Sequence, residues 1–248
     1  MKIRFLGTSH GVPAADRFCS CIMIESGGSV YFIDGGAPII DLLLRNGRRP
    51  EEMRALFNTH IHGDHTAGIY HLADLIDWYY KKAAMDFYIP DQSYIDALKN
   101  MILVGNPHAS LDPERLRFYV AEAGVVYSDE NISVEYIPTK HLAEPRHSYS
   151  ILVREGESAV LFSGDLSQHL AKEDVPAVLW EQEIDLFVCE MAHFNVEQIS
   201  PYLNKAKAKK VAFTHVFPLE KYQSIEAARS KFNFEIITPD DGDVIEIS

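Results

Sequence analysis

Short apolar runs recur along the whole chain and alternate with segments of helical periodicity. Turns such as Ser26-Gly27-Gly28-Ser29 separate the runs. We predict strands at residues 2–6, 21–25, 30–33, 55–58, 87–90, 116–120, 132–138, 149–153, 159–162, 186–189, 211–214, 235–237 and 244–247. Helical spacing of the apolar residues predicts helices at residues 39–44, 66–80, 93–103, 196–208 and 220–231. Strands that mostly alternate with helices indicate a layered α/β protein.

The predicted strands fall into two groups of similar size, which suggests two sheets packed face to face. The chain has no long Pro/Gly/Ser linker, no low-complexity segment and no repeat on the scale of a solenoid. A chain of 248 residues is long enough for one large domain with a substantial core. We therefore expect a single domain over residues 1–248.

The strongest chemical pattern follows the predicted strand at residues 55–58. It is Thr59-His60-Ile61-His62-Gly63-Asp64-His65. Side chains at positions i and i+2 of an extended chain point the same way, so His60 and His62 can bind one ion together. Gly63 allows a sharp turn, after which Asp64 and His65 begin the next helix and can reach a second ion. These donors suit zinc or another borderline divalent metal.

Four donors do not complete two metal sites, so further ligands must come from elsewhere in the chain. His141, Asp165 and His215 each follow a predicted apolar strand. The sites of α/β proteins commonly lie at such strand ends. Each of the three alone could be an exposed loop residue, but together with the first cluster we expect each to be a ligand.

Taken in order, these residues resemble the metallo-β-lactamase superfamily over essentially the whole chain. The shared features are an HxHxDH run, a later single histidine, a Gly-Asp pair after a strand and a final strand-end histidine. Two further segments resemble the ribonuclease Z-like branch, which includes cyclic-phosphate phosphodiesterases. They are Phe5-Leu6-Gly7-Thr8-Ser9-His10-Gly11-Val12-Pro13 and Asp34-Gly35-Gly36. The resemblance implies an α/β fold, a four-layer αββα sandwich with metals between the sheet edges.

The resemblance also implies that two divalent metal ions share seven ligands, with zinc as the first choice and manganese or iron as alternatives. The ligands of one ion would be His60, His62 and His141. The ligands of the other would be Asp64, His65 and His215. Asp165 would bridge the two ions. Asp34 would either orient the ligand loop by hydrogen bonding or form a plain Asp-Gly turn, and the sequence leaves both open.

Three residues are expected to act in catalysis: Asp64, Glu190 and His193. Glu190 matches a glutamate that belongs to the catalytic apparatus of ribonuclease Z-like proteins. The branch's downstream His-Ser-Thr pattern is missing, and Phe194-Asn195-Val196-Glu197 stands in its place. His193 could therefore be a general acid or an imidazole that only contacts substrate. Glu190 could also be a structural hydrogen-bond partner.

The acidic composition narrows the choice of partners. The net charge is -13, from 36 acidic and 23 basic residues, and such a surface repels polyphosphate. We therefore expect a small-molecule, anionic substrate and no structured nucleic acid. No apolar run has the ~18–20 residues of a membrane span, and the first residues do not form a signal peptide. We expect a cytoplasmic protein with no membrane partner, and a homodimer is compatible with the sequence.

The working hypothesis is a phosphodiesterase in which a hydroxide bridged by two metals attacks a small or cyclic phosphodiester. A lactonase, thioesterase or β-lactamase-like hydrolase would use the same dinuclear site on a carbonyl group. Ribonuclease Z-like RNA processing and a non-catalytic metal-binding protein are further alternatives. The sequence leaves open whether His10, His108 or His147 lines the pocket.

Overall fold

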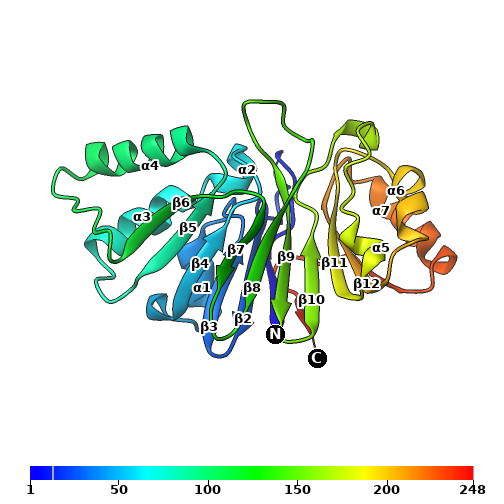
Figure 1. Ribbon diagram of the computed structural model, residues 1–248, viewed down its shortest axis with the longest axis horizontal. Coiled ribbons are helices and arrows are strands. Elements are labelled where there is room, and N and C mark those ends of the chain that lie inside the picture. The colour runs from blue at the N-terminus through cyan, green and yellow to red at the C-terminus, as the bar shows by residue number, and fades with distance from the viewer. Residues whose placement is uncertain (13, 248) are drawn as a thin grey trace.

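Two seven-stranded sheets form the centre of the molecule (Figure 1). The structure is a computed structural model that describes residues 1–12 and 14–247, so Pro13 of the opening segment lies outside the described residues. The first sheet has the order β14 (Val244–Glu246), β1 (Lys2–Gly7), β2 (Cys21–Ser26), β3 (Ser29–Ile33), β4 (Met53–Phe57), β5 (Met85–Ile89) and β6 (Leu116–Val120). The second has the order β13 (Glu235–Ile237), β12 (Ala208–Val216), β11 (Ile184–Met191), β10 (Ser158–Phe162), β9 (Tyr149–Glu155), β8 (Ser133–Pro138) and β7 (Gly124–Ser128). Both sheets are mixed.

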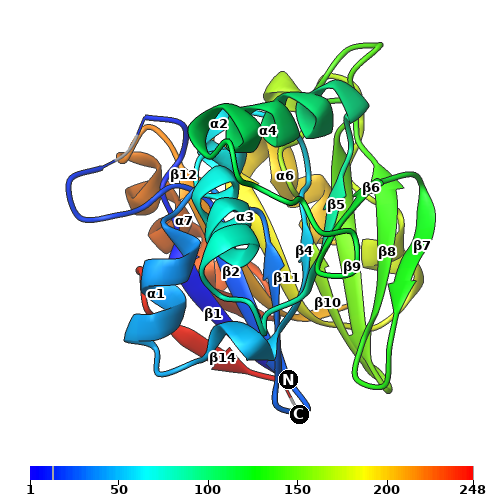
Figure 2. The same cartoon turned by 90° about the vertical axis from the view of Figure 1, so that its left-hand side faces the viewer.

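Helices cover the outer face of each sheet (Figures 1 and 2). The first sheet is covered by α1 (Ile39–Arg45), α3 (Ile69–Trp78) and α4 (Gln92–Gly105). The second is covered by α5 (Val178–Glu181), α6 (Val196–Leu203) and α7 (Lys221–Ala228). Short elements lie in the connections: α2 (Gly63–Thr66) and the 3-10 turns η1 (Pro50–Glu52), η2 (Gln168–Leu170) and η3 (Arg229–Lys231). No helix in the described ranges combines the length and hydropathy needed to cross a membrane.

Three apolar layers hold this arrangement together, and strand β3 shows how its sequence serves two of them. Val30 and Phe32 pack under the helices of the first sheet, whereas Tyr31 and Ile33 pack between the two sheets. All four are buried, because side chains alternate between the faces of a strand and both faces of β3 are covered. The third layer lies between the second sheet and α5–α7. The predicted four-layer αββα sandwich is therefore confirmed.

The helix predicted at residues 66–80 is divided in the structure, and Gly68 is the reason. Its N–H donates to the Gly35 carbonyl oxygen over 2.7 Å. A Cβ atom on Gly68 would lie only 2.0 Å from the Ala37 carbonyl oxygen. The backbone of another loop therefore approaches this position too closely for a continuous helix. Tyr79, near the end of the predicted helix, lies beyond α3 and is 61% exposed.

Three other elements differ from the prediction, among them α5 at Val178–Glu181, where no helix was expected. The helix expected at residues 196–208 ends at Leu203, because the chain turns there to enter β12 at Ala208. Strand β7 was not predicted at all. It is an edge strand whose residues are half-buried or exposed, with Val125 69% exposed, so its alternation of apolar and polar residues is weak.

Candidate metal centre

The HxHxDH run lies where β4 ends, at the edge between the two sheets. The chain stays extended through His62 and turns into α2 at Gly63. His62 is the residue before the helix, so Asp64 falls in its first turn and His65 in its last. The two sheets bring the remaining predicted ligands to the same edge: His141 after β8, Asp165 after β10, and His215 within β12.

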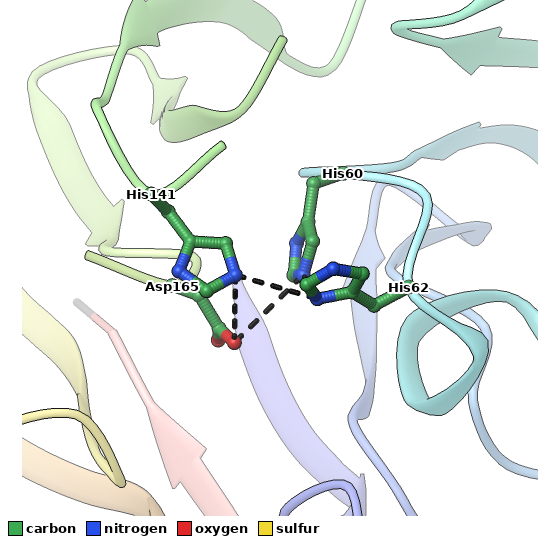
Figure 3. A group of neighbouring side chains, drawn as sticks. All are labelled: His60, His62, His141 and Asp165. Carbon is green, nitrogen blue, oxygen red and sulfur yellow. Dashed lines mark hydrogen bonds and ion pairs between the residues drawn. The ribbon is translucent and has the colours of Figure 1, made fainter. Parts of the chain in front are cut away.

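Four donors form the first group: His60, His62, His141 and Asp165. Figure 3 shows His60 and His62 facing His141 and Asp165 across a small gap. His62 Nδ1 lies 3.1 Å from His60 Nε2 and 3.3 Å from His141 Nε2. Asp165 Oδ2 lies 3.8 Å from both His60 Nε2 and His141 Nε2.

Three donors form the second group: Asp64, His65 and His215. Asp64 Oδ2 lies 3.5 Å from His65 Nε2 and 3.7 Å from His215 Nε2. Asp165 also faces this group, with Oδ1 at 3.5 Å from His65 Nε2 and Oδ2 at 3.5 Å from His215 Nε2. One carboxylate therefore lies between the two groups, as a bridging ligand would.

The donor geometry fits divalent cations. Zn–N bonds of about 2.0–2.1 Å around a tetrahedral ion place neighbouring donors roughly 3.3–3.4 Å apart, close to the separations found in both groups. His65 Nε2 is buried and has no hydrogen-bond partner in the described part of the chain. A buried polar atom without a partner is unfavourable. A cation bound by His65 Nε2 and by the neighbouring carboxylates of Asp64 and Asp165 would provide that partner.

The protonation states of two histidines are also suited to metal binding. Burial, reinforced by the neighbouring histidines, holds the pKa of His60 well below its usual value. The same causes lower the pKa of His215 to about 4. Neutral imidazoles are the form that binds metal, so these side chains are ready to coordinate near neutral pH.

Asp34 supports the contiguous ligand segment through a set of short hydrogen bonds. His65 Nδ1 lies 2.7 Å from Asp34 Oδ2. Thr59 donates its backbone N–H to Oδ1 over 2.8 Å, and Asn58 Nδ2 donates to the same oxygen over 3.0 Å. Burial alone would lower the pKa of His65, but the negative charges of Asp34 and Asp165 raise it well above its usual value. Asp34 thus orients the ligand loop by hydrogen bonding and is more than a plain Asp-Gly turn, which answers the question that the sequence left open.

Glu190 and His193 form a second feature beside Asp165. Glu190 lies at the end of β11, and its Oε1 is 2.8 Å from His193 Nδ1. Burial alone would lower the pKa of His193, but the hydrogen bond and the charge of Glu190 raise it. Glu190 also accepts the backbone N–H of Leu166 over 3.0 Å, in the loop that carries Asp165. The structure therefore links both predicted catalytic side chains to the loop that carries Asp165.

A cavity of about 650 Å³ opens beside these side chains. Asp64, Asp165 and His193 line its floor, and Val12 and Phe217 add exposed apolar surface. His10 lines the cavity too, with its ring centroid 3.9 Å from that of Phe217. His147 lines a separate hollow formed by residues 138–149 and Lys172. His108 is exposed in the loop after α4 and contributes to neither lining.

Comparison with known proteins places this architecture in a family. A sequence profile of the family described as anti-Pycsar protein Apyc1 matches residues 1–234. The chain belongs to the Apyc1 family. The matched residues include all seven donors of the candidate metal centre together with Glu190 and His193.

Relatives and solved structures connect this Apyc1-family chain to the metallo-β-lactamase superfamily, in its ribonuclease Z-like branch. Ribonuclease Z of Methanocaldococcus jannaschii is 28% identical over 149 residues, which are 60% of this chain and 46% of the relative. The chain thus spans about half the length of the curated relatives it matches.

Among solved structures, the metallo-β-lactamase fold protein YhfI of Bacillus subtilis has a TM-score of 0.78 at 18% identity and covers 99% of both chains. The short form of human tRNase Z has a TM-score of 0.75 at 19% identity and covers 100% of both chains. The predicted superfamily and branch are confirmed.

Several supporting residues of the Apyc1-family site were not foreseen from the sequence. Ser20 Oγ lies 3.0 Å from His215 Nδ1. Asp174 is buried and accepts the backbone N–H groups of Lys140 (3.0 Å) and Ser167 (2.8 Å), which lie near His141 and Asp165. Ser20 and Asp174 lie in loops of ordinary polar composition. Their only distinguishing property is a tertiary contact, which a single sequence does not display.

Proposed function

We propose that this chain is a metal-dependent phosphodiesterase that hydrolyses a small or cyclic phosphodiester at a site for two divalent metal ions, zinc first. The observation that carries the proposal is the Asp165 carboxylate lying between two donor groups at the floor of an open cavity. The relatives named ribonuclease Z support phosphodiester chemistry, because cleavage of RNA by hydrolysis breaks a phosphodiester bond.

In this proposal each of the two donor groups would hold one ion, and Asp165 would be a ligand available to both. Bound there, the ions would supply a water of lowered pKa and would offset the negative charge that develops on the phosphoryl oxygens. Asp64 and Asp165 set the spacing of the donor groups, and Asp34 and Ser20 keep the His65 and His215 rings oriented.

His193 is proposed to donate a proton to the leaving oxygen. Its Nδ1 is committed to Glu190, so Nε2 is the ring nitrogen that remains for the substrate. The side chain is 22% exposed and lines the cavity. Glu190 favours the protonated ring, because its charge and hydrogen bond raise the pKa of His193. An alkoxide leaving group needs such a proton far more than a nitrophenolate does.

The size of the cavity favours a small substrate. A volume of about 650 Å³ lies within the range of pockets for compact ligands, about 300–1,000 Å³. The net charge of -13 opposes the approach of long polyanions. The names of the relatives keep RNA processing as the second candidate, and the substrate panel described next separates the two.

The test is a substrate panel on purified protein after metal analysis. Bis(p-nitrophenyl) phosphate and a cyclic nucleotide are the phosphodiester arms; a lactone, a thioester and a precursor transfer RNA are the competing arms. We expect hydrolysis of the phosphodiesters. Turnover of the lactone or thioester alone would overturn the proposal, and cleavage of the RNA alone would favour the second candidate. Bound metal without turnover of any arm would indicate a non-catalytic metal-binding protein.

The Asp165→Ala variant tests whether the shared carboxylate matters. We expect at least a roughly 100-fold loss of phosphodiester turnover and a lower metal content, because loss of even an outer-shell partner commonly reduces affinity or activity about 10–100-fold. Asp185→Asn is the matched control, since Asp185 lies near the other end of the same sheet and pairs with Lys209. Full activity in Asp165→Ala would rule out the shared-carboxylate site.

A further inference from the structure

The segment of residues 191–194 carries His193 into the cavity, and its N–H groups face a carboxylate. Glu190 Oε2 accepts the backbone N–H of Ala192 over 2.7 Å and that of His193 over 3.1 Å. Glu190 Oε1 also accepts from the His193 ring. The inner side of the segment is therefore fixed by one buried anion.

The carbonyl groups of the same segment face a cation. Lys221 Nζ, from the first turn of α7, donates to three backbone carbonyl oxygens. They belong to Met191, Ala192 and Phe194, at 2.9, 2.9 and 2.6 Å. The fourth carbonyl, that of His193, accepts the backbone N–H of His169 over 2.7 Å. Every carbonyl from 191 to 194 thus has a donor, and Lys221 donates to three of the four. The Met191 carbonyl also accepts the backbone N–H of Phe217, over a longer 3.5 Å.

This arrangement leaves Lys221 no free hydrogen for a substrate. A lysine ammonium has three N–H donors and no acceptor, and all three are directed at backbone oxygens. Lys221 contributes to the lining of the cavity, where a cation would ordinarily be taken for a phosphate ligand. Its hydrogen-bond geometry assigns it to the protein backbone instead.

The position of Lys221 at the start of α7 indicates that its role lies outside its own helix. It is the first residue of α7, where the helix dipole disfavours a positive charge. Departures from local preference tend to occur where tertiary structure or function demands them. Here the three carbonyl oxygens of the His193 segment supply the compensating interaction.

We propose that Lys221 is a positioning residue that holds the His193 segment in its working geometry by donating to these three carbonyl groups. The inference rests on the proposed role of His193 as proton donor. With Glu190 on the N–H side and Lys221 on the carbonyl side, the segment is clamped between opposite charges. Loss of Lys221 releases the carbonyl side, and the His193 ring then loses its fixed distance from the leaving oxygen.

The first experiment does not depend on activity. Amide hydrogen exchange is measured on the metal-free protein for wild type, Lys221→Ala and Lys221→Met. We expect faster exchange at Ala192 and His193 in both variants. Propylammonium, the fragment missing from Lys221→Ala, restores protection, whereas tetramethylammonium does not, because it carries the charge without N–H donors. Unchanged exchange, or equal restoration by both cations, overturns the proposal.

The second experiment separates positioning from substrate contact. A cyclic nucleotide has an alkoxide leaving group. With this substrate Lys221→Met should lower kcat roughly 10–100-fold, which is part of the ~10²–10⁴-fold rate increase that general acid catalysis supplies. On bis(p-nitrophenyl) phosphate the loss should be several-fold at most, and KM should change little for either substrate. Equal loss on both substrates with a raised KM would mean direct contact with the substrate and would overturn the proposal.

Two controls complete the design. Lys207→Met removes a lysine that donates to a single carbonyl, that of Glu181, and should leave exchange and turnover unchanged. The double variant Lys221→Met/His193→Ala should be no slower than His193→Ala alone; a further loss would show that Lys221 does not act through His193. If wild type hydrolyses no phosphodiester, the proposed function fails, and the exchange experiment still decides whether Lys221 holds the segment.

Discussion

The two sheets contribute to the proposed metal centre in different ways. The first sheet supplies four donors in one run of six residues, His60 to His65, at a single strand end. The second sheet supplies three donors one at a time, from β8, β10 and β12. Local chain geometry therefore builds one half of the site, whereas only the packing of the sheet builds the other.

The residues that hold the ligands in place by hydrogen bonds also differ between the two halves of the site. On the first sheet one carboxylate, that of Asp34, bonds to Thr59, Asn58 and His65 at once. Backbone bonds such as that from the Gly35 N–H to the His65 carbonyl oxygen (2.7 Å) add to it. On the second sheet each ligand has its own partner: Leu166 O for the His141 ring, Glu190 for the Asp165 loop and Ser20 for the His215 ring. The first half therefore shares one central carboxylate among several groups, whereas each ligand of the second half has a separate partner.

The largest effect is therefore expected from Asp34→Ala. The change leaves the Thr59 N–H, the Asn58 amide and the His65 ring without their acceptor in a buried place, which should destabilise the metal-free protein by at least about 2 kcal/mol. Metal affinity should fall at least about 10–100-fold. Urea unfolding and a chelator competition titration measure the two effects.

Asp41→Asn is the control for Asp34→Ala, because it removes an exposed carboxylate at the start of α1. It should leave the metal affinity unchanged and lower the free energy of unfolding by at most about 1 kcal/mol, the contribution of an exposed carboxylate at a helix start. Normal metal affinity in Asp34→Ala would contradict the view that one residue supports the contiguous half.

A smaller effect is expected from Asp174→Asn on the second sheet. Asp174 joins the loops of His141 and Asp165 by accepting from Lys140 N, Ser167 N and Ser167 Oγ. An amide oxygen in the place of Oδ2 can still accept both backbone N–H groups, but it lacks the carboxylate charge, and the amide N–H₂ then faces the Ser167 hydroxyl. The loops should therefore loosen without unfolding. We expect a loss of metal affinity towards the lower end of 10–100-fold, because other contacts also hold these ligands.

The neighbouring Glu173 provides the control for Asp174. Its side chain is exposed, so Glu173→Gln should bind metal as wild type does. A larger loss in Asp174→Asn than in Asp34→Ala would reverse the proposed ranking of the two halves.

The same contrast explains what could be predicted from the sequence. The HxHxDH run is predictable because strand and turn geometry relate neighbouring residues directly. The strand β3, buried on both faces, is predictable from its apolar run, whereas the half-exposed edge strand β7 is missed. His141, Asp165 and His215 could be selected as strand-end residues, but their convergence is a property of the sheet order.

The residues that hold the ligands and His193 in place, such as Lys221 and Asp174, could not be predicted from the sequence, and the reason is physical. Lys221 lies 28 residues from His193 in the sequence (221 − 193), and a lysine at a helix start usually faces water. Asp174 is followed by Val175-Pro176, a sequence typical of an ordinary loop. Both roles arise from buried backbone groups that need partners, and such a need is visible only when the chain is folded.

The smallest effect should come from Asp129, at the opposite end of the second sheet from the metal centre. Asp129 accepts from Tyr31 Oη (2.6 Å), Tyr127 Oη (2.8 Å) and the backbone N–H of Ile132 (2.9 Å). Burial would raise the pKa of Asp129, but these hydrogen bonds outweigh it and lower the pKa. The carboxylate therefore stabilises the fold above its unfolded pKa of about 3.9, and that contribution is lost as the pH falls through the lower folded value.

Asp129→Asn should accordingly lower Tm at pH 7 by a few degrees, at roughly 2–4 °C for each kcal/mol in a chain of this size. The difference in unfolding free energy between wild type and variant should narrow below about pH 5, where the unfolded carboxyl begins to bind protons. Metal content and turnover should not change, because neither half of the site contacts Asp129. A Tm difference that widens towards acid, or a loss of metal, would mean that the far end of the sandwich is coupled to the site.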